Sequence, residues 1–182
     1  PTRIGSFVTF GRRMDRLEKK ARLMIKGGIV SVTFRSLSAE RIIALTCEAE
    51  LSAIEWGGDV HVPHGDVETA REVGCKTREA ELEVAAYGSY YRVAESEAAG
   101  LAFENVLETA SALGTSLIRV WAGNRSPRDA DARYREMVVS DTRRIAEQAS
   151  DAGIRIASEY HGNTLTETSE AASASLGFMG HH

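Results

Sequence analysis

The feature that most constrains the fold of this chain is a regular alternation of short apolar segments with longer amphipathic ones. The short segments are rich in β-branched and aromatic residues, as strands are, and they begin near residues 29, 52, 82, 116 and 154. Every gap between them is too long for a hairpin and holds one helical pattern. Repeated strand–helix units build parallel sheets, so the pattern predicts an α/β protein.

The boundaries of the expected elements follow from the same pattern. We expect strands at 29–34, 52–56, 82–87, 116–121 and 154–158, and helices at 38–50, 66–80, 96–113 and 126–153. Ser38 and Asp66 are suited to cap the first two helices, and Gly114 and Gly153 to end the last two. Residues 4–10 are expected to form a further strand and residues 14–25 a basic amphipathic helix. Five or six parallel strands are therefore expected.

The composition of the chain bears on which molecules it can bind and where in the cell it is expected. The chain has 182 residues, 43% hydrophobic and 26% charged, which suits one globular domain. A net charge of -4 gives no electrostatic reason to expect nucleic acid or an anionic membrane surface as partner. No apolar run reaches the roughly 20 residues that a spanning helix needs, and the first residues lack a signal-peptide pattern. Cys47 and Cys75 have no CxxC spacing, so reduced thiols and a cytoplasmic location are expected.

An acid and an imidazole follow the fifth predicted strand. Glu159 and His161 stand two positions apart, and the period of a strand places both on the same face. The carboxyl end of a parallel strand, before the turn into a helix, is where α/β proteins place their chemistry. A strand-end glutamate held by a neighbouring arginine is the structural alternative, and the pair by itself leaves both possibilities open.

The other strand ends also carry polar or aromatic side chains. They are Glu55, Trp56, His61 and His64 after the second strand, Tyr87, Ser89, Tyr90 and Tyr91 after the third, and Trp121, Asn124 and Arg125 after the fourth. If the sheet closes into a barrel, these loops share one rim, and aromatic faces beside hydrogen-bonding groups suit a polyhydroxylated ligand. The alternatives are that the two tryptophans are packing residues and that the two histidines are ordinary loop residues.

Five segments resemble the sugar phosphate isomerase/epimerase family, whose members are xylose-isomerase-like TIM barrels. The segments occur in order between residues 29 and 172, at compatible spacing: 31–34 (SVTF), 54–61 (IEWGGDVH), 86–91 (AYGSYY), 118–123 (IRVWAG) and 158–166 (SEYHGNTLT). The resemblance implies a partial (β/α) TIM-type barrel with outer helices. It also implies a sugar, a sugar phosphate or a sugar-like keto acid as substrate.

The resemblance further implies a divalent metal, Mn, Mg, Co or Zn, bound at the carboxyl ends of the strands. Glu159 matches the fifth-strand carboxylate, which in the family is both a metal ligand and part of the acid/base machinery for proton transfer between adjacent carbons. His161 and Trp121 match positions that line the substrate pocket. Glu55, His61 and Tyr87 match the ends of the second and third strands and are carried over as substrate-binding candidates.

The resemblance stops after the fifth strand, so the chain is expected to be a truncated barrel. We divide it into an N-terminal segment, 1–28, a partial barrel, 29–176, and a tail, 177–182. A complete barrel takes about 250 residues, and one carboxylate with one histidine makes a poor site for a hard cation. An open sheet leaves two edges free. It also leaves the apolar residues expected on its inner face poorly covered, among them Val32, Ile54, Val84, Ile118 and Ile156. We therefore expect a homo-oligomer, most simply a dimer.

Three functions are compatible with these patterns. The first is a metal-dependent sugar isomerase or epimerase whose activity is impaired in this chain. The second is a non-catalytic barrel fragment that folds by oligomerising. The third is a metal-dependent nuclease of the same superfamily, which the acidic charge balance argues against because phosphate contacts need lysine and arginine.

Overall fold

A computed structural model of the protein describes residues 26–173, and within them the sheet has five parallel strands. The strands are β1 (Gly28–Val30), β2 (Ala53–Gly57), β3 (Glu83–Arg92), β4 (Leu117–Trp121) and β5 (Arg155–Ser158). The helices are η1 (Ser31–Phe34), a 3-10 turn, and α2 (Ala39–Glu48), α3 (Val67–Glu79), α4 (Phe103–Leu113) and α5 (Ala132–Asp151). The strands lie in sequence order, β1-β2-β3-β4-β5, each parallel to the next.

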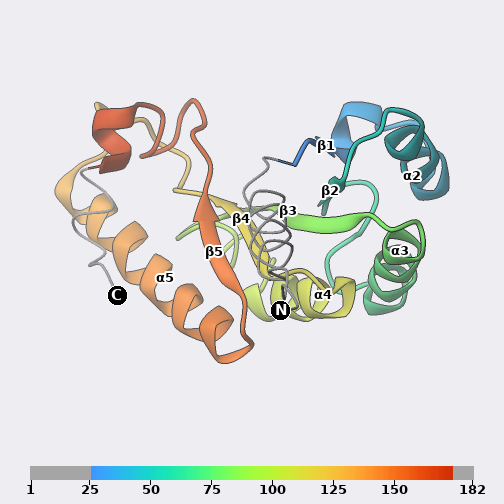
Figure 1. The fold of residues 1–182 in the computed structure, drawn as a ribbon. Coiled ribbons are helices and arrows are strands. Elements are labelled where there is room, and N and C mark those ends of the chain that lie inside the picture. Colours follow the sequence, from blue (N-terminus) through green and yellow to red (C-terminus); the bar gives the residue numbers. More distant parts are fainter. Residues whose placement is uncertain (1–25, 174–182) are drawn as a thin grey trace, which may run out of the picture.

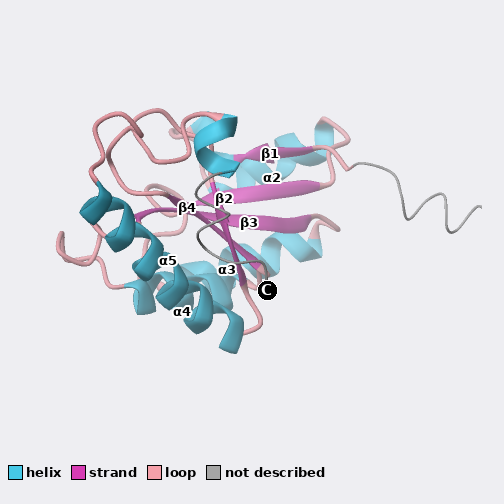
Figure 2. Ribbon diagram, turned by 90° about the vertical axis from the view of Figure 1, so that its left-hand side faces the viewer, coloured by secondary structure: helices cyan, strands magenta, loops and turns pink. Residues whose placement is uncertain are grey.

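The helices cover one side of the curved sheet, as the outer ring of a barrel does. In Figure 1, α2, α3, α4 and α5 follow one another around the outside of the strands, and Figure 2 shows β1, β2 and β3 running side by side. Consecutive strands joined through a helix keep their order in a barrel, so this arrangement is a partial TIM-type barrel. The predicted α/β fold with outer helices is confirmed.

The core lies between the sheet and the helices. Trp56 is fully buried, and its indole Nε1 donates a hydrogen bond of 3.1 Å to Thr77 Oγ1 of α3. Trp56, Tyr87, Ile118 and Ile156 are register partners across four strands, so they form one row on this helix-facing side. Expecting apolar strand residues on the inner face was wrong. Ile54 and Ile118 are fully buried in this core, and Val84 and Ile156 pack against it.

Several boundaries differ from the predicted ones, and at three of them a side-chain hydrogen bond sets the observed start or end. Strand β3 also continues to Arg92, five residues beyond its predicted end. The first strand stops at Val30, since the hydroxyl of buried Ser31 accepts a hydrogen bond from the Gly57 amide (2.9 Å). Helix α4 begins at Phe103 and not at 96, because the Ser96 hydroxyl accepts from the Arg92 amide (2.7 Å) in a separate turn. Helix α5 begins at Ala132, where Asp131 caps the Tyr134 amide.

Some expectations concern parts of the chain that the structure does not cover. The predicted strand at 4–10, the predicted helix at 14–25 and the tail 177–182 lie outside the described residues, so the division into segments stays a prediction. Within residues 26–173, no helix is long and apolar enough to cross a membrane.

Candidate functional site

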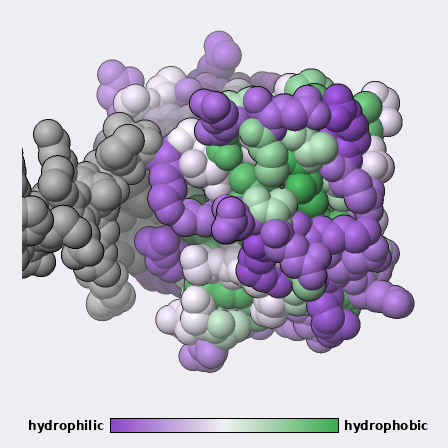
Figure 3. Space-filling model, turned by 45° about the vertical axis from the view of Figure 1, so that its right-hand side comes forward, coloured by the Kyte–Doolittle hydropathy of each residue, from purple (hydrophilic) through white to green (hydrophobic). Residues whose placement is uncertain are grey.

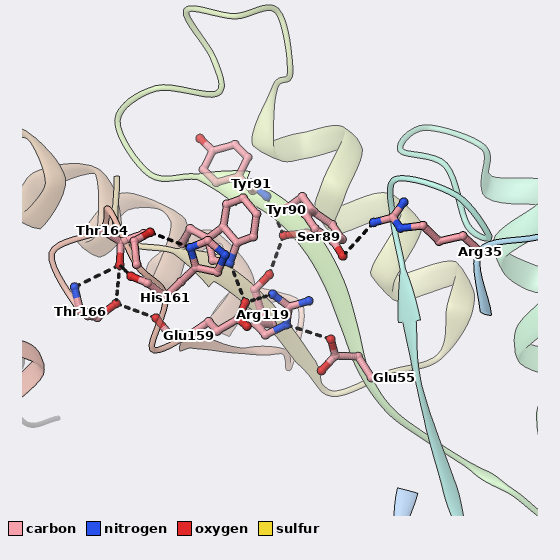
Figure 4. A network of polar contacts seen from close by, with 12 residues as sticks. Arg35, Glu55, Ser89, Tyr90, Tyr91, Arg119, Glu159, His161, Thr164 and Thr166 are labelled. Atoms are coloured by element: carbon pink, nitrogen blue, oxygen red, sulfur yellow. Dashed lines mark hydrogen bonds and ion pairs between the residues drawn. The ribbon is translucent and has the colours of Figure 1, made fainter. Parts of the chain in front are cut away.

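The inner face of the sheet carries an arginine held between two glutamates. Arg119 of β4 donates from Nε to Glu55 Oε1 of β2 at 2.8 Å, and its Nη1 forms an ion pair with Glu159 Oε2, just after β5. Figure 4 shows the guanidinium between the two carboxylates. Arg119 and Glu55 side chains are 15% and 17% exposed and Glu159 is 34% exposed, so the cluster is partly shielded from water.

Glycine makes room for this cluster. Gly57, Gly88, Arg119 and Ala157 are register partners on the inner face, and the two glycines on β2 and β3 leave space beside Arg119. A Cβ at Gly88 would lie 2.7 Å from both Arg119 Nη2 and Glu55 Oε1. Any larger residue at position 88 would therefore push against the ion pair between β2 and β4.

Aromatic rings cover one side of Glu159. The Trp121 indole Nε1 donates to Glu159 Oε2 at 2.6 Å, and the His161 ring lies 4.3 Å from the Trp121 ring at an interplanar angle of 32°. Tyr90, in the left-handed region at φ 55°, meets Trp121 edge-on at 5.1 Å. The Arg92 guanidinium lies over the Trp121 ring, 4.3 Å from its centroid. The Glu159 carboxylate, the rings of His161 and Tyr90 and the Arg92 guanidinium thus all lie against Trp121.

Buried threonines fix the loop that presents Glu159 and His161. The Glu159 amide continues the sheet by donating to Val120 O at 3.0 Å. The Thr166 hydroxyl donates to the Glu159 carbonyl at 2.6 Å, and the Thr164 hydroxyl donates to the His161 carbonyl at 2.7 Å. Both threonines are buried. The backbone that carries Glu159 and His161 is therefore held in place by the two threonine side chains.

His61 lies apart from the cluster around Arg119. Its Nδ1 is 3.0 Å from the hydroxyl of Ser31, which also accepts from the Gly57 amide. Nε2 is buried and has no hydrogen-bond partner among the described residues. The ring meets Trp56 edge-on at 6.0 Å.

Tyr87 faces the helices, on the side of the sheet opposite Glu55 and Arg119. It is fully buried, and its hydroxyl donates to Val62 O (2.9 Å) and lies 2.8 Å from His64 Nδ1. Burial raises the pKa of Tyr87 above its ordinary value. Burial also lowers the pKa of His64, against the opposing effects of a hydrogen bond to the Ser89 backbone and the charge of Asp59. The structure brings Glu55, Trp121, Glu159 and His161 together, but not Tyr87 or His61.

Arg119 is the residue that the sequence analysis missed. Burial acts to lower its pKa, but the charge and hydrogen bond of Glu55, followed by the charge of Glu159, raise it overall, so the guanidinium stays protonated. The signal was present in the sequence, because a single charged residue stands between Ile118 and Val120 in an apolar strand. Alternation places such a residue on the face opposite its apolar neighbours.

The donor set does not fit a divalent metal. Glu159 Oε2 is engaged by both Arg119 and Trp121, and Glu55 Oε1 is engaged by Arg119. Hard cations take several oxygen ligands free of competing cations. Within residues 26–173 there is no group of three or more histidine, cysteine, aspartate or glutamate side chains that could hold a metal ion.

Comparisons with known proteins agree with this architecture. The family model "Xylose isomerase-like TIM barrel" matches residues 43–179, more than half of the chain. No curated protein sequence matches. Among solved structures, the probable 3-DHS dehydratase AsbF from Bacillus anthracis, involved in petrobactin synthesis, is 25% identical with a TM-score of 0.73, covering 86% of this chain and 60% of its own.

Two further solved structures share the fold at lower identity. A D-allulose 3-epimerase from Methylomonas sp. is 20% identical with a TM-score of 0.65, covering 85% of this chain and 59% of its own. A xylose isomerase-like TIM barrel protein from Mycobacterium smegmatis in complex with magnesium is 14% identical with a TM-score of 0.60, covering 82% and 60%. This chain spans about three fifths of the length of these three proteins. By its family model and its sheet of five parallel strands, the chain belongs to the xylose isomerase-like TIM barrel family.

Proposed function

We propose that this chain belongs functionally with the sugar isomerases and epimerases of its family. Its described residues would then form the part of the site that holds a polyhydroxylated carbonyl compound. The observation that carries the proposal is the position of Glu159, a carboxylate bonded to the indole of Trp121, against which the His161 ring lies. Sugar C–H faces pack on such rings, while hydroxyl groups bond to carboxylates and guanidinium groups.

Glu159 is the proposed acid/base. The carboxylate would take the proton from the carbon next to the substrate carbonyl, leaving an enediolate, and would return it to the adjacent carbon on the same face. Trp121 Nε1 and the Thr166 hydroxyl orient this residue, the first through its carboxylate and the second through its backbone carbonyl. Trp121, His161 and Tyr90 would form the wall on which the substrate lies, with Glu55 on the far side of Arg119.

The proposal also includes that the catalytic activity of this chain is impaired. The family expectation is a divalent metal with Glu159 as one ligand, and the magnesium complex from Mycobacterium smegmatis shows that a relative binds such an ion. The described residues supply two carboxylates bridged by an arginine, which do not suit the ion. The D-allulose 3-epimerase and the probable 3-DHS dehydratase are our guides to the substrate class, a ketose or a cyclic keto acid.

Two tryptophans on opposite faces of the sheet provide the test of binding. Trp56→Phe leaves Trp121, in the proposed site, as the only tryptophan, and Trp121→Phe leaves only the core residue Trp56. Titrating both variants with a panel of ketoses, sugar phosphates and cyclic keto acids should change the fluorescence of Trp56→Phe in a saturable way and leave Trp121→Phe unchanged. Equal responses from the two variants, or none from either, would contradict a ligand site at Trp121.

Proton transfer is tested separately from binding. Incubation with the bound ligand in D₂O should produce slow C–H to C–D exchange, followed by NMR, and Glu159→Gln should abolish it. Glu170→Gln, at an exposed position, is the matched control and should exchange as the wild type does. Binding without any exchange would favour a second function, a non-catalytic barrel fragment that binds a sugar and folds by oligomerising. The observation behind that candidate is that β1 and β5, among the described residues, each pair with one strand.

A further inference from the structure

The position of Arg119 suggests more than a structural ion pair. Its guanidinium contacts two carboxylates whose residues lie 64 and 40 positions away in the chain, one on β2 and one after β5. The carboxylate oxygens that bind Arg119 would also face any other cation placed between Glu55 and Glu159. The two glutamates are therefore held close together across the inner face of the sheet, with one positive charge between them.

A guanidinium in this position competes directly with a metal ion. Two partly shielded carboxylates that face each other repel unless a cation lies between them. Arginine cannot lose its proton in a protein, so its charge is permanent, and its planar group suits carboxylate oxygens. Gly88 supports this arrangement, because a Cβ there would meet both the guanidinium and Glu55. The backbone beneath the site is thus shaped around the arginine.

We propose that Arg119 is the resident cation of this site. It occupies the place between Glu55 and Glu159 that a divalent ion would need, and it closes the site to such an ion while the ion pairs are formed. The consequence is that removing the guanidinium charge should create metal affinity where the wild type has little. This inference does not depend on turnover or on any sugar, so it stands or fails independently of the proposed function.

The experiment is a titration with Mn²⁺ alone, following free Mn²⁺ by its EPR signal. We expect Arg119→Met, which keeps much of the side-chain length without charge, to bind Mn²⁺ at least tenfold more tightly than the wild type. The second substitution Glu55→Gln, added to Arg119→Met, should remove this gain because one carboxylate is lost. The matched control is Arg92→Met, which removes an arginine charge from the same rim without touching either glutamate. It should behave as the wild type does. The terminal histidines are common to all variants and cancel in the comparison.

Thermal unfolding gives a second readout. Mn²⁺ should raise the Tm of Arg119→Met and leave the Tm of the wild type and of Arg92→Met unchanged. If Arg119→Met does not fold alone, Arg119→Gln keeps a hydrogen-bond donor, and added Mn²⁺ should restore the far-UV circular dichroism of either variant. The inference is overturned if the wild type binds Mn²⁺ as tightly as Arg119→Met, if the gain survives Glu55→Gln, or if neither variant folds with or without Mn²⁺.

Discussion

At the scale of single residues, the polar side chains at the strand ends divide by the face of the sheet they occupy. Glu55 and Arg119 lie on the inner face, where they meet Glu159 and the rings of Trp121 and His161. Tyr87 and His64 lie on the helix-facing side and bond to each other. All of these residue types suit a binding site. Which of them share a face follows from strand register. The register shifts along β3 break the simple alternation by which a sequence position predicts a face.

The partly buried His64 predicts a loss of stability in mild acid. Its Nδ1 lies 2.8 Å from the Tyr87 hydroxyl, which also donates to Val62 O. Burial lowers the pKa of His64 in the folded state, so below the ordinary histidine pKa, about 6.5, the unfolded chain binds more protons. Stability is therefore full above that pH and falls as the pH drops toward the lowered folded-state value.

The comparison that isolates this effect uses His64→Asn, whose amide can hydrogen-bond the Tyr87 hydroxyl and does not titrate. We expect the Tm of the wild type to fall more than the Tm of His64→Asn between pH 8 and pH 5.5, as followed by circular dichroism. Parallel pH profiles for the two proteins would show that His64 does not contribute.

At the scale of the elements, helix beginnings depend on contacts that periodicity does not reveal. Helix α4 was expected from residue 96, but Ala94 and Gly100 adopt left-handed conformations around a turn that Ser96 holds. Asp141 of α5 also accepts from the Ala94 amide at 2.6 Å, so this turn is fixed by a distant helix. Helix ends were easier to predict, because Gly114 and Gly153 lie in the left-handed region that favours glycine.

The end of α4 supplies a stability prediction. Gly114 has φ 80°, and its amide donates to Ala110 O and Ser111 O. Replacing it with alanine should cost about 1–2 kcal/mol of unfolding free energy, because a Cβ is strained in this conformation. The Arg78 guanidinium, which donates to Leu113 O at 2.9 Å, would also have to move, since Nη1 lies 2.6 Å from the new Cβ.

Urea unfolding of Gly114→Ala measures this cost. Gly162→Ala is the matched control, since nothing lies within 4 Å of its added Cβ and its φ is not left-handed. We expect the control to unfold within a few tenths of a kcal/mol of the wild type. An unchanged midpoint for Gly114→Ala would mean that the C-terminus of α4 relaxes without loss.

At the scale of the whole molecule, the open sides of the sheet matter most. Among the described residues β1 pairs with β2 alone and β5 with β4 alone, and Val30 of β1 is 37% exposed. Figure 3 shows an apolar area framed by hydrophilic side chains on the side of the molecule where α2 and α3 lie in Figure 1. Free strand edges and exposed apolar area both favour association.

We therefore predict that the protein associates with itself, most simply as a two-fold dimer. Multi-angle light scattering after size exclusion should give about twice the mass of one chain at micromolar concentration. Val30→Lys, which places a charge on the edge strand, should shift the population toward the monomer. Met137→Lys, at an exposed position on α5, is the control and should leave the mass unchanged. A wild-type protein that runs as a monomer would contradict the prediction.

The sequence by itself determined the order and type of the elements and hence the α/β class. Local periodicity and glycine signals act within a few residues, and five strand–helix units admit few topologies. It also singled out Glu159 and His161, since period 2 and a strand end are local properties. Only the tertiary structure decided that Ile54 and Ile118 belong to the core between the sheet and the helices, and that Tyr87 faces the helices and not the site. It alone joined Arg119 to Glu55 and Glu159, because an ion pair between residues 40 and 64 positions apart depends on how neighbouring strands are placed in register.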